Sequence, residues 1–193
     1  CRLGNCNYKT SLKSFAAALT EMVAGLTIGK KKYAEVEEEM KAAIEPMHAI
    51  CEHLLDDIKR DSESFDLYMQ ALTLPKETEE EKAARQEAMQ NGLKAAVAVP
   101  LSVAKRAYEI MPYAEVMVTK GNKTAVTDAL VATMMARTAV LGALFNVKIN
   151  LESIKDEAFV AETTKEVEVL EKKAIEHEQK ILAKAGVSKS VVE

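Results

Sequence analysis

Residues 33–74 read YAEVEEEMKAAIEPMHAICEHLLDDIKRDSESFDLYMQALTL, and this stretch decides the fold. Its apolar residues recur every three or four positions, which is the spacing of one face of an α-helix. They are Tyr33, Val36, Met40, Ile44, Met47, Cys51, Leu54, Ile58, Phe65, Met69 and Leu72. The pattern predicts one long helix that Pro46 kinks but does not end, because the stripe continues in phase beyond it.

The stripe has one gap, between Ile58 and Phe65, and Asp61 occupies the position that would fill it. An ionised carboxylate on a core face is costly unless it is paired or hydrogen-bonded. The same setting can turn a carboxylate into a useful acid or base. The alternative is that Asp61 lies at the edge of a wide stripe and reaches water. The pattern alone leaves both interpretations open.

Composition favours an all-α protein. The 193 residues fit a single domain over 1–193, with 48% apolar and 29% charged residues and only 7 Gly and 4 Pro. Helix-forming residues dominate, and no alternating β-branched run competes with them. The net charge of -4, with both signs interspersed, argues against a nucleic-acid partner, which would require a basic face.

The remaining segments predict further helices. After an irregular lead-in over 1–10, a helix runs from Ser11 and stops at Gly29. Thr78 and Glu81 form a capping box that starts a third helix, bent at Pro100 and bent or broken near Pro112. Gly121-Asn122 is a turn.

The segment 124–147 is apolar nearly all round, which predicts a helix buried at the centre of the bundle. Its charges, Asp128 and Arg137, are nine residues apart and lie on opposite faces, so each needs a partner from another helix, a second subunit or a ligand. A short exit segment over 146–151 leads to a last helix over 154–185, capped by Ser153 and Asp156. Gly186 ends this helix before a frayed tail, and His177 is expected on its solvated face. We therefore expect an antiparallel bundle of about five helices.

The most apolar stretch, 125–147, is interrupted by charges, so we expect no membrane partner. Cys1, Cys6 and Cys51 are too few for a disulfide framework, which favours a reduced, cytoplasmic setting. The chain begins at Cys1 without a signal pattern, and we expect native N-terminal residues to be missing or processed away.

Several polar groups are candidates for chemistry. The cluster His48, Cys51, Glu52 and His53 lacks a converging partner group, so we expect a surface hydrogen bond and no metal. The run Lys30-Lys31-Lys32 either holds a polyanion or is a solvated helix start. Asn122 fits a turn, whereas Asn146 and Asn150 lie among apolar residues, where buried amides must be satisfied.

A set of segments in a fixed order resembles the cyclodeaminase/cyclohydrolase family of folate one-carbon enzymes, over about residues 15–159. Members include the cyclodeaminase domain of formimidoyltransferase-cyclodeaminases and the methenyltetrahydrofolate cyclohydrolases. The matching segments are Leu26-Thr-Ile-Gly-Lys-Lys-Lys-Tyr33, Asp61 with Phe65, Leu74-Pro-Lys76, Glu79-Glu-Glu-Lys82, Val99-Pro-Leu101, Gly121-Asn122 with Asp128, Asn146-Val-Lys-Ile-Asn-Leu151 and Asp156-Glu-Ala-Phe159.

The resemblance implies an all-helical homodimer with its folate site near the subunit interface and no tightly bound cofactor. The family's proposed proton acceptor corresponds to Asp61. The resemblance further implies that Asp128, Asn146 and Asn150 line the site. A tetrahydrofolate derivative would be the substrate, and Lys31, Lys32 and Tyr33 are expected to bind it, the lysines at its polyglutamate tail.

One feature departs from the family. The family carries a Gly-Gly-Gly-Ser loop before its first long helix, and the corresponding positions here are Gly4-Asn5-Cys6-Asn7, with one glycine. This departure puts activity in question but not the fold. Segments 61–76 and 121–151 resemble those of the bifunctional enzyme's domain, so the resemblance favours a formimidoyltetrahydrofolate cyclodeaminase. The alternatives are a methenyltetrahydrofolate cyclohydrolase, an inactive folate-binding subunit and a plain helical interaction module.

Overall fold

Five long helices make up the part of the chain that the structure describes. The computed structural model describes residues 7–186, with side chains from Ser14 onward except that of Ile58. The elements in chain order are α1 (Asn7–Thr27), the 3-10 helix η1 (Lys31–Val36), α2 (Glu37–Leu72), α3 (Glu79–Lys120), the 3-10 helix η2 (Lys123–Ala125), α4 (Val126–Leu151) and α5 (Glu157–Ala185). The predicted all-α bundle of five helices is confirmed.

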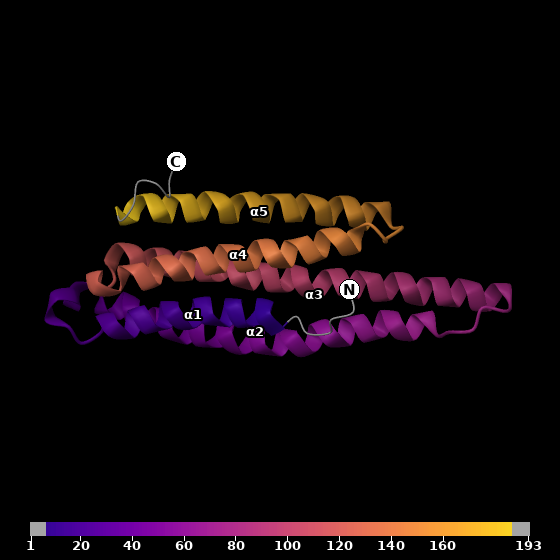
Figure 1. Cartoon of the computed structure of the whole chain (residues 1–193), viewed down its shortest axis with the longest axis horizontal. Helices are drawn as coiled ribbons and strands as arrows, with labels where there is room; N and C mark the ends of the chain where they lie inside the picture. The colour runs from indigo at the N-terminus through magenta and orange to yellow at the C-terminus, as the bar shows by residue number, and fades with distance from the viewer. Residues whose placement is uncertain (1–6, 187–193) are drawn as a thin grey trace.

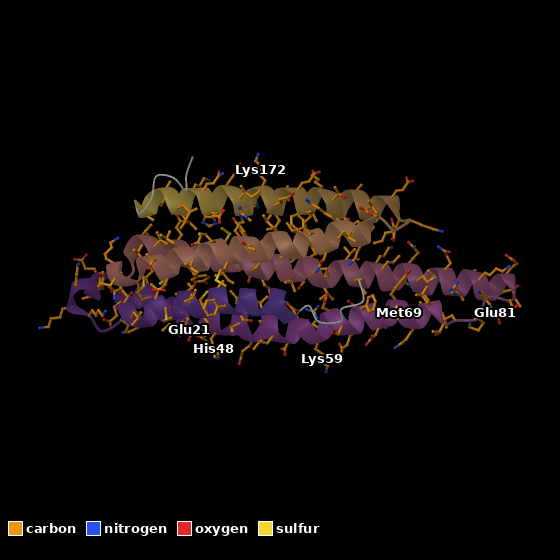
Figure 2. All side chains as sticks on the ribbon, viewed as in Figure 1. Glu21, His48, Lys59, Met69, Glu81 and Lys172 are labelled. Carbon is orange, nitrogen blue, oxygen red and sulfur yellow. The ribbon has the colours of Figure 1, made fainter. Side chains whose placement is uncertain are left out.

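The helices run antiparallel to their neighbours in sequence (Figure 1). α1 packs against α2 and α4, α3 packs against the same two helices, and α5 lies against α3 and α4. The helices differ in length, and Figure 1 shows the joined ends of α2 and α3 projecting beyond the start of α1 and the end of α4. Met69 and Glu81 mark this projecting end, and Lys172 marks the outer side of α5 (Figure 2).

α4 is the central helix only in part. It packs against α1, α3 and α5 through a face made mostly of alanine, valine and leucine, and small side chains allow close helix approach. Its opposite face exposes Val131, Met134, Phe145 and Ile149, so the expectation of burial on all sides was wrong for this face. By length and composition alone, residues 123–151 could cross a membrane, but here they form a helix at the centre of the bundle.

Helix ends follow local chemistry, with some departures from expectation. The Thr78 hydroxyl accepts from the Glu81 N–H at 3.1 Å and the Glu81 carboxylate accepts from the Thr78 N–H, so the capping box is confirmed. Gly29 and Gly186 adopt left-handed φ values of 76° and 62°, which favour glycine. Asp156 caps α5 by accepting from the Phe159 N–H at 3.0 Å.

Three expected boundaries were wrong. α1 already includes residues 7–10 of the expected lead-in. The third helix was expected to be bent or broken near Pro112; α3 continues through this residue to Lys120 without a break, and a bend there stays a prediction. Residues 146–151 are the last turns of α4 because no glycine or proline interrupts them. Ser153 lies outside α5, which starts only at Glu157. Whether Pro46 and Pro100 kink their helices stays a prediction, and the tail after Gly186 is outside the described residues.

Charged pairs hold α5 to the bundle. The Glu115 carboxylate of α3 accepts from His177 Nε2 at 2.8 Å and also from the Lys184 ammonium. Arg137 of α4 donates to Glu178 at 2.9 Å, so its partner is a neighbouring helix. His177 is therefore not on the solvated face, because α5 turns it toward α3, where its ring lies 5.8 Å from that of Tyr108.

The Glu115 pairs predict a pH-dependent contribution to stability. The hydrogen bond from Lys184, followed by that from His177, holds the pKa of the Glu115 carboxyl below its ordinary value. A group with a depressed folded-state pKa stabilises the fold above its unfolded pKa, near 4.3, and that stability is lost as the pH falls through the folded-state value. Glu115→Gln should lower the Tm at pH 7 by roughly 2–4 °C, equivalent to about 1 kcal/mol for a screened pair.

The difference in Tm between the two proteins should shrink as the pH drops from 6 toward 3, which circular dichroism melting curves would measure. Glu109→Gln, at an exposed position of α3, is the matched control and should leave the Tm nearly unchanged. A gap for Glu115→Gln that stays constant across this range would contradict the role assigned to the Glu115 carboxylate.

Candidate functional site

The inner face of α2 changes from apolar to polar along its length. Spacings of three and four residues connect its inward positions, as expected for a helix packed in a bundle. These positions are Met40, Ala43, Met47, Ile50, Leu54, Asp57, Asp61, Ser64, Tyr68 and Ala71, all buried or half-buried. The second half of α2 therefore presents mainly polar groups to the bundle.

The predicted core stripe was wrong beyond Ile58. Phe65 is 56% exposed and Met69 is also exposed, whereas Ser64 is buried. The inward face repeats every 3.5 residues on average, and Phe65 lies one position beyond it. Asp61 does lie on the inward face and is half-buried, so it is neither fully enclosed nor at the outer edge. A carboxylate in this position is desolvated in part and still reachable.

A buried ion pair lies one turn before Asp61. Asp57 is 2% exposed, and its carboxylate accepts from Arg60 Nη1 at 2.6 Å and from Arg106 Nη1 of α3. Sequence inspection missed both Asp57 and Arg106. The four-residue step from Asp57 to Asp61 on one helix face was the available signal for the first, whereas pairing with Arg106 depends on the packing of α3.

Two contacts show which residues of neighbouring helices lie at the same height along the bundle axis, and we call this height their level. Asp57 of α2 pairs with Arg106 of α3, and Asn150 of α4 donates to the Ala96 carbonyl of α3 at 2.8 Å. Both helix pairs are antiparallel. Asp61 lies one turn after Asp57 on α2, and Asn146 lies one turn before Asn150 on α4, so both lie near residues 99–102 of α3. The structure thus brings the predicted residues Asp61, Asn146 and Asn150 to one section of the bundle, which we call the Asp61 section.

The other predicted site residues lie at the opposite end. Asp128 precedes Asn146 by eighteen residues on α4, about 27 Å along the axis. Lys31 and Lys32 belong to η1, before α2 begins, so they are more than about 36 Å from Asp61 along that helix. Within one chain, the predicted residues therefore form two groups rather than one site.

Tyr33 and Asn122 connect loops at that far end. The Tyr33 hydroxyl donates to Asn122 Oδ1 at 3.4 Å and accepts from the Lys123 N–H at 2.9 Å. Asn122 is buried, and its amide donates to the Leu26 carbonyl at 3.1 Å while its oxygen accepts from the Thr124 N–H. The interpretation of Asn122 as a turn residue is confirmed. Tyr33 has a non-helical backbone, so the long helix begins after it rather than at it.

α1 begins at the level of the Asp57 pair. The Cys51 thiol contacts the Ser14 carbonyl at 3.9 Å, and the antiparallel register then sets Asn7 near Ile58. Beyond this point the described part of α1 no longer covers α2. Gly4, Asn5 and Cys6, which correspond to most of the family's glycine loop, lie outside the described residues.

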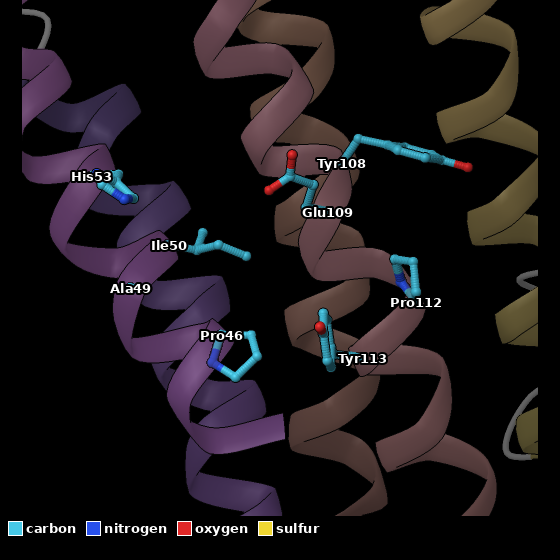
Figure 3. A pocket seen from close by; sticks show the side chains of 8 residues that line it. All are labelled: Pro46, Ala49, Ile50, His53, Tyr108, Glu109, Pro112 and Tyr113. Atoms are coloured by element: carbon cyan, nitrogen blue, oxygen red, sulfur yellow. The ribbon is translucent and has the colours of Figure 1, made fainter. Parts of the chain in front are cut away.

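A shallow groove runs between α2 and α3 elsewhere (Figure 3). It has a volume of about 580 Å³ and mostly apolar walls. Its lining residues are Pro46, Ala49, Ile50, His53, Tyr108, Glu109, Pro112 and Tyr113. None of the predicted site residues lines it.

His48 Nε2 and Glu52 Oε1 lie 3.6 Å apart on the exposed surface of α2. Among the described residues, no group of three acidic, histidine or cysteine side chains is arranged to hold a metal.

Asn150 of α4 has a structural partner on α3. Pro100 has no N–H, so the Ala96 carbonyl one turn earlier lacks its usual helical donor. The Asn150 side chain supplies that donor from α4. The hydrogen bond satisfies an otherwise unpaired acceptor beside a buried proline. Asn146, one turn earlier on α4, is half-buried.

Comparisons with known proteins place these features in a family. Residues 12–169 match the sequence profile of the family described as formiminotransferase-cyclodeaminase. The methenyltetrahydrofolate cyclohydrolase of Methylorubrum extorquens is 42% identical over 157 residues, which cover 81% of this chain and 76% of that protein. The formimidoyltransferase-cyclodeaminase of Sus scrofa is 36% identical over 157 residues, and the match covers 29% of its length.

The fold has a solved counterpart. The crystal structure of formiminotetrahydrofolate cyclodeaminase from Thermotoga maritima superimposes with a TM-score of 0.76 and 31% sequence identity. The match covers 91% of this chain and 85% of that chain. The chain therefore spans most of this structure and of the cyclohydrolase relative, but less than a third of the Sus scrofa relative.

The Asn150 hydrogen bond predicts energetic coupling with Pro100. Asn150→Ala should destabilise the protein by about 1–3 kcal/mol, because it leaves the Ala96 carbonyl unpaired. In a Pro100→Ala background, residue 100 has an N–H that satisfies Ala96, so the same change should cost about 1 kcal/mol less. Urea unfolding of the four proteins of this cycle would measure the coupling.

Pro46→Ala is the matched control, because this proline lies in α2, remote in sequence from Asn150, and its effect should add to that of Asn150→Ala. If the effects of Asn150→Ala and Pro100→Ala on stability also add, the structural role proposed for Asn150 is wrong.

Proposed function

Because the chain belongs to the formiminotransferase-cyclodeaminase family, we propose that it acts on the one-carbon unit at N5 and N10 of tetrahydrofolate, with Asp61 as the proton acceptor. The observation that carries the proposal is the half-buried Asp61 carboxylate on the inward face of α2, in a section that also contains Asn146 and Asn150. Partial burial keeps a base reachable and limits competing water.

The chemistry requires one positioned base. In the cyclodeaminase reaction, N10 attacks the formimidoyl carbon on N5, Asp61 accepts the N10 proton, and ammonia leaves after a proton is returned to it. In the cyclohydrolase reaction, water attacks the methenyl carbon and Asp61 accepts a water proton. The N5–carbon bond then breaks as N5 takes a proton and the hydroxyl loses its own, which gives the 10-formyl product. Both routes pass through a tetrahedral carbon, so one arrangement of residues can support either.

Each candidate reaction has its own support. Similarity to the Thermotoga maritima structure over 91% of this chain favours the cyclodeaminase. The 42% identity to the Methylorubrum extorquens protein favours the cyclohydrolase as the second candidate. Methenyltetrahydrofolate has a distinct absorbance. Its appearance from formimidoyltetrahydrofolate would identify the cyclodeaminase, and its accelerated loss would identify the cyclohydrolase. Folate binding without turnover of either substrate would instead indicate an inactive folate-binding subunit.

Asp61→Asn separates catalysis from structure. The amide keeps the size of the side chain but cannot accept the proton. We expect kcat to fall by about 10² to 10⁴, the usual range for a general base, with little change in folate affinity. Stability should hold or rise, because an ionisable group on an inward face is a burden to the fold. Steady-state kinetics, isothermal calorimetry and melting curves would measure these three quantities.

Asp66→Asn, at an exposed position of the same helix, is the matched control and should leave kcat near the wild-type value. Near wild-type turnover with a lowered Tm in Asp61→Asn would end the catalytic assignment.

We also propose that the protein is a homodimer. The exposed stripe of α4, with Val131, Met134, Phe145 and Ile149, is apolar, and α1 beside it exposes Phe15, Met22 and Leu26. Exposed apolar residues on two neighbouring helices favour association. A second copy that covers this surface would also offer a way to bring one chain's Lys31, Lys32, Tyr33 and Asp128 toward the other chain's Asp61 section.

A charge placed on the α4 stripe should break the dimer. Val131→Glu would bury an unpaired carboxylate in the interface, which is costly, and is expected to give monomers at micromolar concentration in multi-angle light scattering. Val169→Glu on α5 is the control, because Val169 is 48% exposed against 44% for Val131 but lies outside this stripe. A wild-type protein that is monomeric at this concentration would contradict the proposal.

The remaining expectations stay proposals. Lys31 and Lys32 are exposed, as binding of a folate polyglutamate tail would require, but ordinary solvated lysines would look the same. A cytoplasmic location and the absence of nucleic-acid and membrane partners also stay predictions.

A further inference from the structure

The charges around Asp61 are unequal in number. Asp57 and Asp61 are four residues apart on one helix face, so their β-carbons are roughly 6 Å apart. Two carboxylates this close disfavour each other's ionised form. Here, however, two guanidinium groups surround Asp57, from Arg60 on the same helix and Arg106 on α3. The group of Asp57, Arg60 and Arg106 therefore carries a net charge of about +1 rather than -1.

The Asp57–Arg106 ion pair is also only weakly screened by water. Asp57 is buried, and the Arg106 side chain is only 27% exposed, so water screens their field less than it screens a surface pair. The arginine on α3 lies one turn from the level of Asp61. Asp57 is thus anchored by an arginine from a second helix, and not only by its neighbour in sequence.

We propose that Asp57 and Arg106, assisted by Arg60, are positioning residues that set the charge beside Asp61 and keep its carboxylate ionised in the pH range where the enzyme works. The inference rests on the proposed function, because it gives a role to the surroundings of the proposed base. Without Arg106, the cluster would carry about zero charge and would no longer favour the ionised form of Asp61, so the acid limit of activity would move to higher pH.

Other charged groups near this level are neutralised by partners. On α3, Lys105 pairs with Glu166 at 2.6 Å, and on α4, Lys148 pairs with Glu171 at 2.8 Å, both toward α5. The α4 groups at this level, Asn146 and Asn150, are uncharged amides. These pairs are neutral overall, whereas the Asp57 cluster keeps a net charge of about +1 one helical turn from Asp61.

The inference predicts opposite shifts for the two partners of one ion pair. Activity that needs ionised Asp61 is lost below its pKa, so kcat/KM falls at low pH, and we call this part of the pH profile the acid limb. Arg106→Gln reduces the cluster to about zero charge, raises the pKa of Asp61 and should move this limb up by about one pH unit. Asp57→Asn raises the cluster charge to about +2 and should move the limb down by a similar amount.

The double variant Asp57→Asn/Arg106→Gln restores a charge of about +1 and should return the limb close to its wild-type position. A merely structural pair would not behave in this way, because both single changes would destabilise the fold without shifting the limb in opposite directions. If a single variant folds poorly, Arg60→Gln supplies the test, since Arg60 is 48% exposed and its loss should move the limb up by a smaller amount.

The experiment follows methenyltetrahydrofolate absorbance between about pH 4 and 8, with the uncatalysed rate subtracted. Lys120→Gln is the matched control, because it removes an α2–α3 ion pair with Glu39 at 2.8 Å. That pair lies eighteen residues from Asp57 along α2, about 27 Å away, so it should not move the limb.

The two proposals fail in different ways. Near wild-type turnover in Asp61→Asn would overturn the assignment of Asp61 as the base. Loss of turnover in Asp61→Asn, with no shift or shifts of the same sign in Arg106→Gln and Asp57→Asn, would overturn the positioning role alone. Opposite shifts that cancel in the double variant would support it.

Discussion

The inward face of α2 repeats every seven residues, and the rest of the bundle depends on how that face is buried. Its first half presents Met40, Met47 and Leu54, which are fully buried against neighbouring helices. Burial of such side chains contributes about 1.5–3 kcal/mol each, so this half anchors the packing. Its second half presents Asp57, Asp61 and Ser64, which contribute little hydrophobic stabilisation. The same helix therefore supplies the core at one end and the candidate chemistry at the other.

The polar half of α2 and the helices around it bury charged and hydrogen-bonding groups, and specific partners offset the free-energy cost of burying them. Burial of a carboxylate is costly without a counter-charge, and Arg106 reaches Asp57 from α3. Pro100 would leave the Ala96 carbonyl unpaired, and the Asn150 amide reaches it from α4. Both contacts fix the register of α3 against its neighbours. The Asp61 section is thus held by polar interactions between helices where the apolar core thins out.

The unequal lengths of the helices explain where this section lies. The described part of α1 ends its cover of α2 near the Asp57 pair, while α2 and α3 continue past it (Figure 1). At this level the Asp61 side chain is half-buried, which suits a residue that must meet a substrate. The exposed apolar stripe of α4 has the opposite character, because it offers no chemistry and gains from being covered.

The sequence by itself determined the helical class, the number of helices and several of their ends. These features follow from local physics: apolar spacing, the capping box at Thr78 and the left-handed glycines 29 and 186 each act within a few residues. The sequence also singled out Asp61, since an acid inside an apolar pattern is visible without coordinates. Only the tertiary structure decided that Phe65 faces outward, that Asp57 is buried and paired with Arg106, and that Asn150 serves the carbonyl freed by Pro100. It also separated Lys31 and Asp128 from Asp61. Each of these outcomes depends on which residues of distant segments share a level in the bundle, and the axial register of packed helices is not encoded within any one of them.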